Sequence, residues 1–156
     1  MSLVYNTYKT DLLRIKRGNC RGIFSNAKPI FMVSLIDAIN EGLILGNKIP
    51  FVCDGLKGIY DYNSAYNCSV QDVVRRNSIT EYRLPFFHLN AESFYHIKWK
   101  PELYDIPRQG ESPSNKFMTT YVDYAYLDDG LWELLQDASV REEFRAAIIN
   151  HYLKEK

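Results

Sequence analysis

Residues 30–41 constrain the fold of this chain more than any other segment. Their apolar side chains return every three to four residues, which is the spacing of one broad face of an α-helix. These side chains are Phe31, Met32, Leu35, Ile36, Ile39 and, just beyond them, Leu43. Pro29 suits a first helical turn, Ser25 or Asn26 can cap the start, and Gly42 follows as a stop. We therefore expect the central core helix here.

Length and composition indicate one ordinary globular domain over residues 1–156. A chain of 156 residues with 46% hydrophobic and 24% charged residues can bury a core without a metal or a disulfide. Cys20, Cys53 and Cys68 are odd in number and widely spaced, which fits neither a disulfide framework nor a zinc site. No apolar run approaches the roughly 20 residues of a membrane helix, and the N-terminus lacks the apolar core of a signal peptide. These features predict reduced thiols and a cytoplasmic protein that does not enter a membrane.

Weaker patterns lie on either side of the core helix. Residues 5–17 mix apolar and basic side chains at nearly helical spacing, and residues 18–26 form the loop that follows. Residues 48–52 are partly β-branched, which is typical of a brief strand or an extended link. Residues 56–66 carry another helical pattern, and residues 70–74 a short helical turn.

The last third of the chain alternates between a loop, a strand and two helices. Residues 101–115 contain three prolines and a glycine, which predicts a loop. Residues 121–127 are expected to be extended. Asp128 or Asp129 can cap the helix that follows, and Ser139 can cap a last helix in which apolar residues repeat every fourth position.

Two aromatic-rich runs, residues 84–89 and 94–99, enclose a polar segment of ordinary loop length at residues 90–93. This arrangement predicts an antiparallel hairpin, similar to the wing of a winged-helix domain. The expected fold class is therefore α+β: a mostly helical single domain with a small antiparallel hairpin, winged-helix-like.

The formal net charge is zero, so any affinity for a polyanion must come from charges separated into patches. Such a separation is present. The cations before the core helix are Lys9, Arg14, Lys16, Arg17, Arg21 and Lys28, opposed by Asp11 alone. The last third is rich in Asp and Glu. One end of the chain is basic and the other is acidic.

The sequence offers no pattern typical of a catalytic, metal or nucleotide centre, and we expect no cofactor. His88 and His96 both fall in the predicted hairpin, where packing and surface roles are commoner than metal or catalytic ones. Asp128 and Asp129 stand at a predicted helix start, where capping explains them more simply than a metal does.

Cationic residues near the core helix and the hairpin are the informative feature, because they could follow a phosphate backbone. The predicted DNA contacts are Arg21, Lys28, Arg75, Arg76, Arg83, Leu84, Pro85 and His88. Lys28 precedes Pro29 at a helix N-terminus, where backbone amides and the helix dipole also favour an anion. A solvated lysine beside a helix cap is the competing interpretation of Lys28.

Three segments, residues 26–42, 84–89 and 124–153, carry a resemblance to a known domain. Together they resemble the recognition domain that precedes the HNH nuclease in certain bacterial restriction endonucleases. That group includes the sulfur-binding domains of McrA-like enzymes, which recognise phosphorothioate-modified DNA. The resemblance spans nearly the whole chain through short motifs. It implies an HNH nuclease, fused or separate, as a partner of this domain.

In those domains a His-Arg pair before the core-helix proline contacts the modified phosphate, and a Tyr-Pro pair forms an apolar cradle for sulfur. This chain has Ala27-Lys28 and Leu84-Pro85 at these positions. The resemblance implies that Lys28 neutralises the phosphate while Leu84 and Pro85 contact the larger, less hydrated sulfur. Because Lys28 lacks the bidentate fork of arginine, the resemblance supports DNA binding more directly than sulfur recognition.

The expected function is a DNA-recognition module of a bacterial restriction or defence system, without catalysis by this chain alone. The alternative is a protein-interaction or scaffold domain that exposes the aromatic residues of the hairpin. Those residues are Phe87, Phe94, Tyr95 and Trp99. An intrinsic nuclease is the third and weakest hypothesis, and it predicts metal-dependent cleavage.

Overall fold

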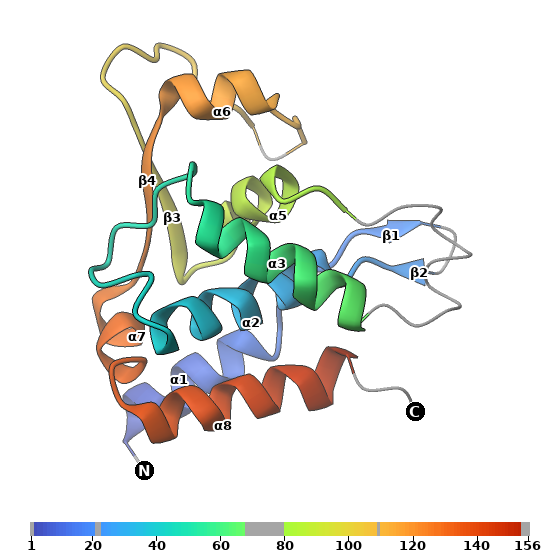
Figure 1. Ribbon diagram of the computed structural model, residues 1–156, viewed down its shortest axis with the longest axis vertical. Coiled ribbons are helices and arrows are strands. Elements are labelled where there is room, and N and C mark those ends of the chain that lie inside the picture. Colours follow the sequence, from blue (N-terminus) through green and yellow to red (C-terminus); the bar gives the residue numbers. More distant parts are fainter. Residues whose placement is uncertain (1, 21–22, 68–79, 109, 154–156) are drawn as a thin grey trace.

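The computed structural model of the protein describes residues 2–20, 23–67, 80–108 and 110–153. This described part is α+β and mostly helical, with two short antiparallel sheets of two strands each (Figure 1). The helices are α1 (Leu3–Leu12), α2 (Ala27–Asn40), α3 (Asp54–Asn67), α5 (Arg83–His88), α6 (Asn115–Tyr121), α7 (Asp129–Leu134) and α8 (Ala138–Ile148). The short helical turns are η1 (Leu89–Ala91) and η2 (Ile149–Leu153). The strands are β1 (Asn19–Cys20), β2 (Ile23–Phe24), β3 (Tyr95–Trp99) and β4 (Val122–Leu127).

Helix α2 forms the centre of the core, which confirms the prediction for this segment. Every residue from 31 to 36 is buried, and α3, α5 and α8 pack around the helix. Gly42 stops the helix, as expected: its φ is 76°, a left-handed conformation that glycine adopts at little cost. The amides of Gly42 and Leu43 donate to the carbonyls of Ile39 and Ala38, at 3.1 and 2.9 Å. These bonds satisfy carbonyl groups that the helix end would otherwise leave unpaired.

The predicted hairpin is wrong. Residues 83–88 are helical and form α5, with Pro85 in the first turn, where a missing backbone donor is tolerated. A short apolar run suits a buried helix and a buried strand equally well, so its spacing could not distinguish them. Strand β3 pairs instead with β4, from Tyr95 opposite Leu127 to Trp99 opposite Val122. The small antiparallel sheet therefore joins two distant segments, and residues 84–89 do not form a wing.

Other predicted elements are present with shifted boundaries. Helix α1 ends at Leu12, earlier than expected, whereas α3, β4 and the loop before α6 agree with the prediction. Within residues 48–52, Ile49 forms an isolated bridge with Ala125 at the edge of β4. The turn predicted at residues 70–74 and Cys68 lie outside the described residues. None of the described helices is both long and apolar enough to cross a membrane.

The capping at the starts of α7 and α8 differs from that predicted. Asp128 precedes α7, but its side chain makes no capping hydrogen bond. It accepts a hydrogen bond from the hydroxyl of Tyr8 at 2.9 Å and lies 2.6 Å from Nε2 of His96. Asp137, and not Ser139, caps α8, because its carboxylate accepts the amide of Ser139 at 2.9 Å.

Candidate functional site

A cavity of ≈ 480 Å³ lies at the N-terminal end of α2. Four of the predicted DNA contacts line it, namely Lys28, Leu84, Pro85 and His88. The other lining residues are Lys16, Arg17, Gly18, Ser25, Ala27, Thr80, Ala91 and Ser112. Segments from before α2, from around α5 and from the loop before α6 therefore converge at one place. We call it the α2 cavity.

Arg17 is held in a defined position beside this cavity. Its Nη1 donates to the side-chain oxygen of Asn26 at 2.8 Å. Its guanidinium lies over the rings of Phe24 and Tyr152, at 4.7 and 5.1 Å from the ring centres. Such stacking holds the planar group without neutralising it. Among the described residues, no ion pair involves Arg17 or its exposed neighbour Lys16.

The start of α2 adds a partial positive charge to the same place. Asn26 is the N-cap residue, yet its side chain makes no hydrogen bond to the helix, since its oxygen accepts from Arg17. The hydroxyl of Ser25 accepts the amide of Ala27 at 3.3 Å. The positive end of the helix dipole therefore points at a cavity that Lys16 and Arg17 also line.

Lys28 differs from both interpretations that its sequence position allowed. Its Nζ lies 3.1 Å from a carboxylate oxygen of Glu92, and the two side chains are only 15% and 9% exposed. Lys28 is therefore neither a solvated lysine nor an uncompensated cation. The pair adds no net charge to the α2 cavity, and the positive charge there comes from Lys16 and Arg17.

One wall of the α2 cavity is apolar. Leu84 and Pro85 supply it from the first turn of α5, together with Ala27 and Ala91. Pro85 is buried, and the two residues after it, Phe86 and Phe87, are buried in the core, which fixes the orientation of α5. The geometry places apolar surface directly beside the basic groups.

His88, the last residue of α5, also lines the α2 cavity. Nε2 of His88 lies 3.3 Å from the hydroxyl of Ser112, which belongs to the loop before α6. Both residues line the α2 cavity. This contact ties the loop to the cavity rim, so the loop contributes to the site as well as connecting β3 to α6.

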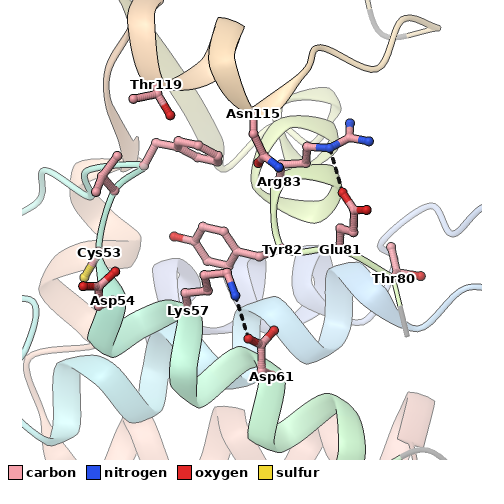
Figure 2. Close-up of a pocket in the computed structure, with 12 residues that line it drawn as sticks. Cys53, Asp54, Lys57, Asp61, Thr80, Glu81, Tyr82, Arg83, Asn115 and Thr119 are labelled. Carbon is pink, nitrogen blue, oxygen red and sulfur yellow. Dashed lines mark hydrogen bonds and ion pairs between the residues drawn. The ribbon is translucent and has the colours of Figure 1, made fainter. Parts of the chain in front are cut away.

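Arg83 points to a different place from the other predicted contacts. Its Nε lies 2.9 Å from a carboxylate oxygen of Glu81, and its Nη1 donates to the carbonyl of Pro113 at 2.9 Å. Figure 2 shows this ion pair at the edge of a second cavity, of ≈ 530 Å³. Thr80 lines both cavities, so they flank the chain segment that leads into α5. Arg83 and Lys28 thus line different cavities, and each is paired with a carboxylate. Arg21, Arg75 and Arg76 lie outside the described residues.

The aromatic residues proposed as an exposed patch are mostly inside the protein. Phe87, Phe94 and Tyr95 are each at most 1% exposed, and Trp99 is half-buried. The hydroxyl of Tyr95 donates to the carbonyl of Phe86 at 2.7 Å, which ties β3 to α5. Phe87, Phe94 and Tyr95 therefore build the core beneath the site and are not part of the protein surface.

His96 and Asp128 form a structural contact where β3 begins and β4 ends. Asp128 joins β3 to α1 through its bonds to His96 and Tyr8. Burial, followed by the hydrogen bond to Asp128, raises the pKa of Tyr8 to about 12. No group of three or more His, Cys, Asp or Glu side chains is placed to hold a metal within the described part of the chain.

Sequence reasoning missed three residues that decide the charge of the α2 cavity: Lys16, Arg17 and Glu92. The first two were counted in the basic N-terminal stretch but not assigned to the site, although they come directly before the loop that leads to α2. Nothing in the sequence indicated that Glu92 would pair with a lysine 64 positions away. Neither the family models nor the curated proteins compared with this sequence match it.

Proposed function

We propose that this protein binds duplex DNA and that the α2 cavity receives a backbone phosphate. One observation carries the proposal: Lys16 and Arg17 meet the positive end of α2 without a carboxylate partner among the described residues. Phosphate groups bind where cationic side chains and helix N-termini converge. The guanidinium of Arg17 can hold two phosphate oxygens in its planar fork.

The apolar wall of the α2 cavity suits the less polar parts of the DNA backbone beside the phosphate. Leu84 and Pro85 offer carbon surface beside the cations, where a sugar ring or a non-bridging atom can pack. Sulfur is larger and less hydrated than oxygen, so a phosphorothioate would gain more from this wall than a plain phosphate. The apolar wall therefore supports the proposal that the α2 cavity prefers a phosphorothioate to a plain phosphate.

The resemblance to the recognition domains of HNH restriction endonucleases extends this proposal. In that setting the protein is a cytoplasmic recognition module of a bacterial restriction or defence system. Cleavage would come from an HNH nuclease, fused to it or separate. The domain's role is to locate DNA, because phosphate contacts position a protein on the duplex and groove contacts read the sequence.

Fluorescence anisotropy with a labelled duplex at two salt concentrations tests the proposal. We expect affinity to fall steeply as salt rises, because binding releases counterions from the phosphates. Arg17→Gln should weaken binding about tenfold and lower the salt dependence, whereas Arg17→Lys should lose less because it keeps the charge. Arg108→Gln, at an exposed arginine of the loop before α6, is the matched control.

The outcomes separate the competing functions. A duplex carrying phosphorothioate at one linkage should bind more tightly than its plain counterpart, and Pro85→Ala should reduce that difference. Thermal unfolding of each variant shows whether it has kept its fold, because Arg17 also packs on Phe24 and Tyr152. Absent binding, or binding insensitive to salt and to Arg17→Gln, would overturn the proposal.

A further inference from the structure

The second cavity, of ≈ 530 Å³, lies between helices that are far apart in the sequence (Figure 2). Asn115 and Thr119 of α6 stand on one side, and Lys57 and Asp61 of α3 stand on the other. Tyr82, which comes just before α5, lies between them. We call this the Tyr82 cavity.

The hydroxyl of Tyr82 is the unusual group here. Tyr82 is only 5% exposed, and its oxygen has no hydrogen-bond partner among the described residues. Buried polar atoms are nearly always hydrogen-bonded, since an unpaired one costs free energy. Figure 2 shows the hydroxyl pointing toward Cys53 and Asp54, which also line the cavity. A ligand that reaches this point would supply the missing partner.

The hydroxyl can act as a donor at neutral pH. Burial raises the pKa of Tyr82 well above its usual range, so the group keeps its proton. The ring is fixed by its neighbours: it packs against Phe31 and Phe51, with ring centres 5.7 Å away in both cases. The donor therefore occupies a defined position. Because its oxygen is closed to solvent, a ligand reaches it only when neighbouring side chains of the cavity wall move.

The charges of the Tyr82 cavity exclude an anionic ligand. Three carboxylates and two cations line it. Lys57 pairs with Asp61 at 2.8 Å, and Arg83 pairs with Glu81 at 2.9 Å. Both cations are thus compensated, and Asp54 is left as an additional negative charge at the cavity wall. A phosphate would be repelled, whereas a neutral ligand with hydrogen-bonding groups is favoured.

The remaining polar groups can both donate and accept. The amide of Asn115 and the hydroxyls of Thr80 and Thr119 do both, and Asp54 accepts. Phe51 adds aromatic surface to the same cavity. An aromatic wall combined with hydrogen-bond donors and acceptors is the environment that nucleobases meet in proteins that read them individually.

We propose that the Tyr82 cavity binds a nucleobase, with the Tyr82 hydroxyl donating to a ring nitrogen or carbonyl oxygen. The base has two sources: a free nucleoside, or a base turned out of a DNA strand. The second source rests on the proposed DNA-binding function. Thr80 lines both cavities, so a base in the Tyr82 cavity would lie near a phosphate in the α2 cavity.

Titration with free nucleosides, followed by amide NMR signals, tests the base site alone. A panel of adenosine, cytidine, 5-methylcytidine, guanosine and thymidine should include at least one that shifts the signals of Asn115 and Thr119. Tyr82→Phe keeps the ring and removes only the donor, so it should weaken that binding about tenfold. Asn115→Ala, at an exposed position of α6, should weaken it to a similar degree.

Thermal unfolding supplies a readout that distinguishes the ligand role from a structural one. Because the Tyr82 hydroxyl has no partner among the described residues, Tyr82→Phe should melt at the same temperature as the parent or higher. Tyr62→Phe, at an exposed tyrosine of α3 that lies outside the cavity lining, is the matched control. The proposal is overturned if no nucleoside shifts these signals at about 10 mM. It is equally overturned if Tyr82→Phe and Asn115→Ala bind like the parent.

A duplex containing 2-aminopurine distinguishes the two sources, because this base brightens when it leaves the stack. A rise in fluorescence with the parent protein, lost in Tyr82→Phe, identifies a base turned out of DNA. Nucleoside binding without such a rise identifies the free base as the ligand. Arg17→Gln should shift the duplex signal to about tenfold higher protein concentration and leave nucleoside titration unchanged, so failure of the α2 cavity and failure of the Tyr82 cavity give different results.

Discussion

The hydroxyl of Tyr152 accepts the backbone amide of Ile15 at 2.9 Å and donates to the carbonyl of Leu12 at 2.8 Å. One side chain near the C-terminus thus satisfies two backbone groups at the end of α1. The same ring lies under the guanidinium of Arg17. The hydrogen bonds of Tyr152 therefore join the C-terminal segment to the end of α1. The same residue also helps to position Arg17 beside the α2 cavity.

Tyr152→Phe should destabilise the protein by about 1–3 kcal/mol, because it leaves a buried amide and a carbonyl without partners. Urea unfolding measures the loss. Tyr124→Phe, at a half-exposed tyrosine of β4, should change stability by less than about 0.5 kcal/mol. If DNA affinity also falls in folded Tyr152→Phe, the contact positions Arg17 as well as stabilising α1.

Glu92→Gln should tighten DNA binding, because it frees the charge of Lys28 at the α2 cavity. We expect a gain of several-fold at low salt and a steeper dependence on salt. Anisotropy with the same duplex measures both. Glu111→Gln, at an exposed carboxylate that does not line the α2 cavity, is the control. An unchanged affinity in Glu92→Gln would place the bound phosphate away from Lys28.

Asp37→Ala should cost about 1–3 kcal/mol of stability, because Asp37 joins three helices. Its carboxylate contacts Arg145 of α8 at 2.6 Å and accepts from the amide of Asn63 in α3 at 3.1 Å. Asp61→Ala breaks an exposed pair with Lys57 and should cost only about 0.3–0.5 kcal/mol. Equal losses in the two variants, by chemical denaturation, would contradict this account.

Gly42→Ala should destabilise the end of α2 by about 1–2 kcal/mol. No atom lies within 4 Å of the position that the added Cβ would occupy, so the cost arises from the positive φ alone. Gly46→Ala provides the comparison, because that position is equally open and its φ is not positive. Thermal unfolding of both variants should show a loss only at residue 42.

Alkaline pH should destabilise the protein through its buried tyrosines. Burial raises the pKa of Tyr82 and Tyr95, and burial with a hydrogen bond to Asp128 raises that of Tyr8 to about 12. In the unfolded chain these groups ionise near pH 10, so stability is complete below about pH 10 and falls as pH rises toward 12. Each group contributes up to about 1.4 kcal/mol per pH unit in that window.

Urea unfolding at several pH values between about 9 and 12 measures this slope. Tyr82→Phe should make the slope shallower by the contribution of one group. It is the cleanest variant for this purpose, since its hydroxyl has no hydrogen-bond partner among the described residues. A slope that is unchanged in Tyr82→Phe would show that Tyr82 ionises at the same pH in both states.

Local chemistry made several features of this protein predictable. The apolar spacing of residues 31–39 and the stop at Gly42 predicted α2, since helical period and a left-handed glycine are properties of short segments. The family resemblance, and not local chemistry, implied that Lys28, Leu84 and Pro85 share one site, and these three residues line one cavity. The loop before α6 and strand β4 were also predicted.

Only the tertiary structure decided the features that depend on partners distant in the sequence. Residues 83–88 form a helix whose Phe86 packs edge-on against Phe31 of the core, and β3 pairs with the distant strand β4. Glu92 pairs with Lys28, which lies 64 positions away in the sequence, and neutralises its charge. The uncompensated positive charges at the α2 cavity are therefore those of Lys16 and Arg17. Periodicity and capping act within a few residues, so the sequence could predict α2 and its ends. Charge pairing and burial depend on which segments meet in space, so the sequence could not predict that Lys16, Arg17 and Glu92 set the charge of the α2 cavity.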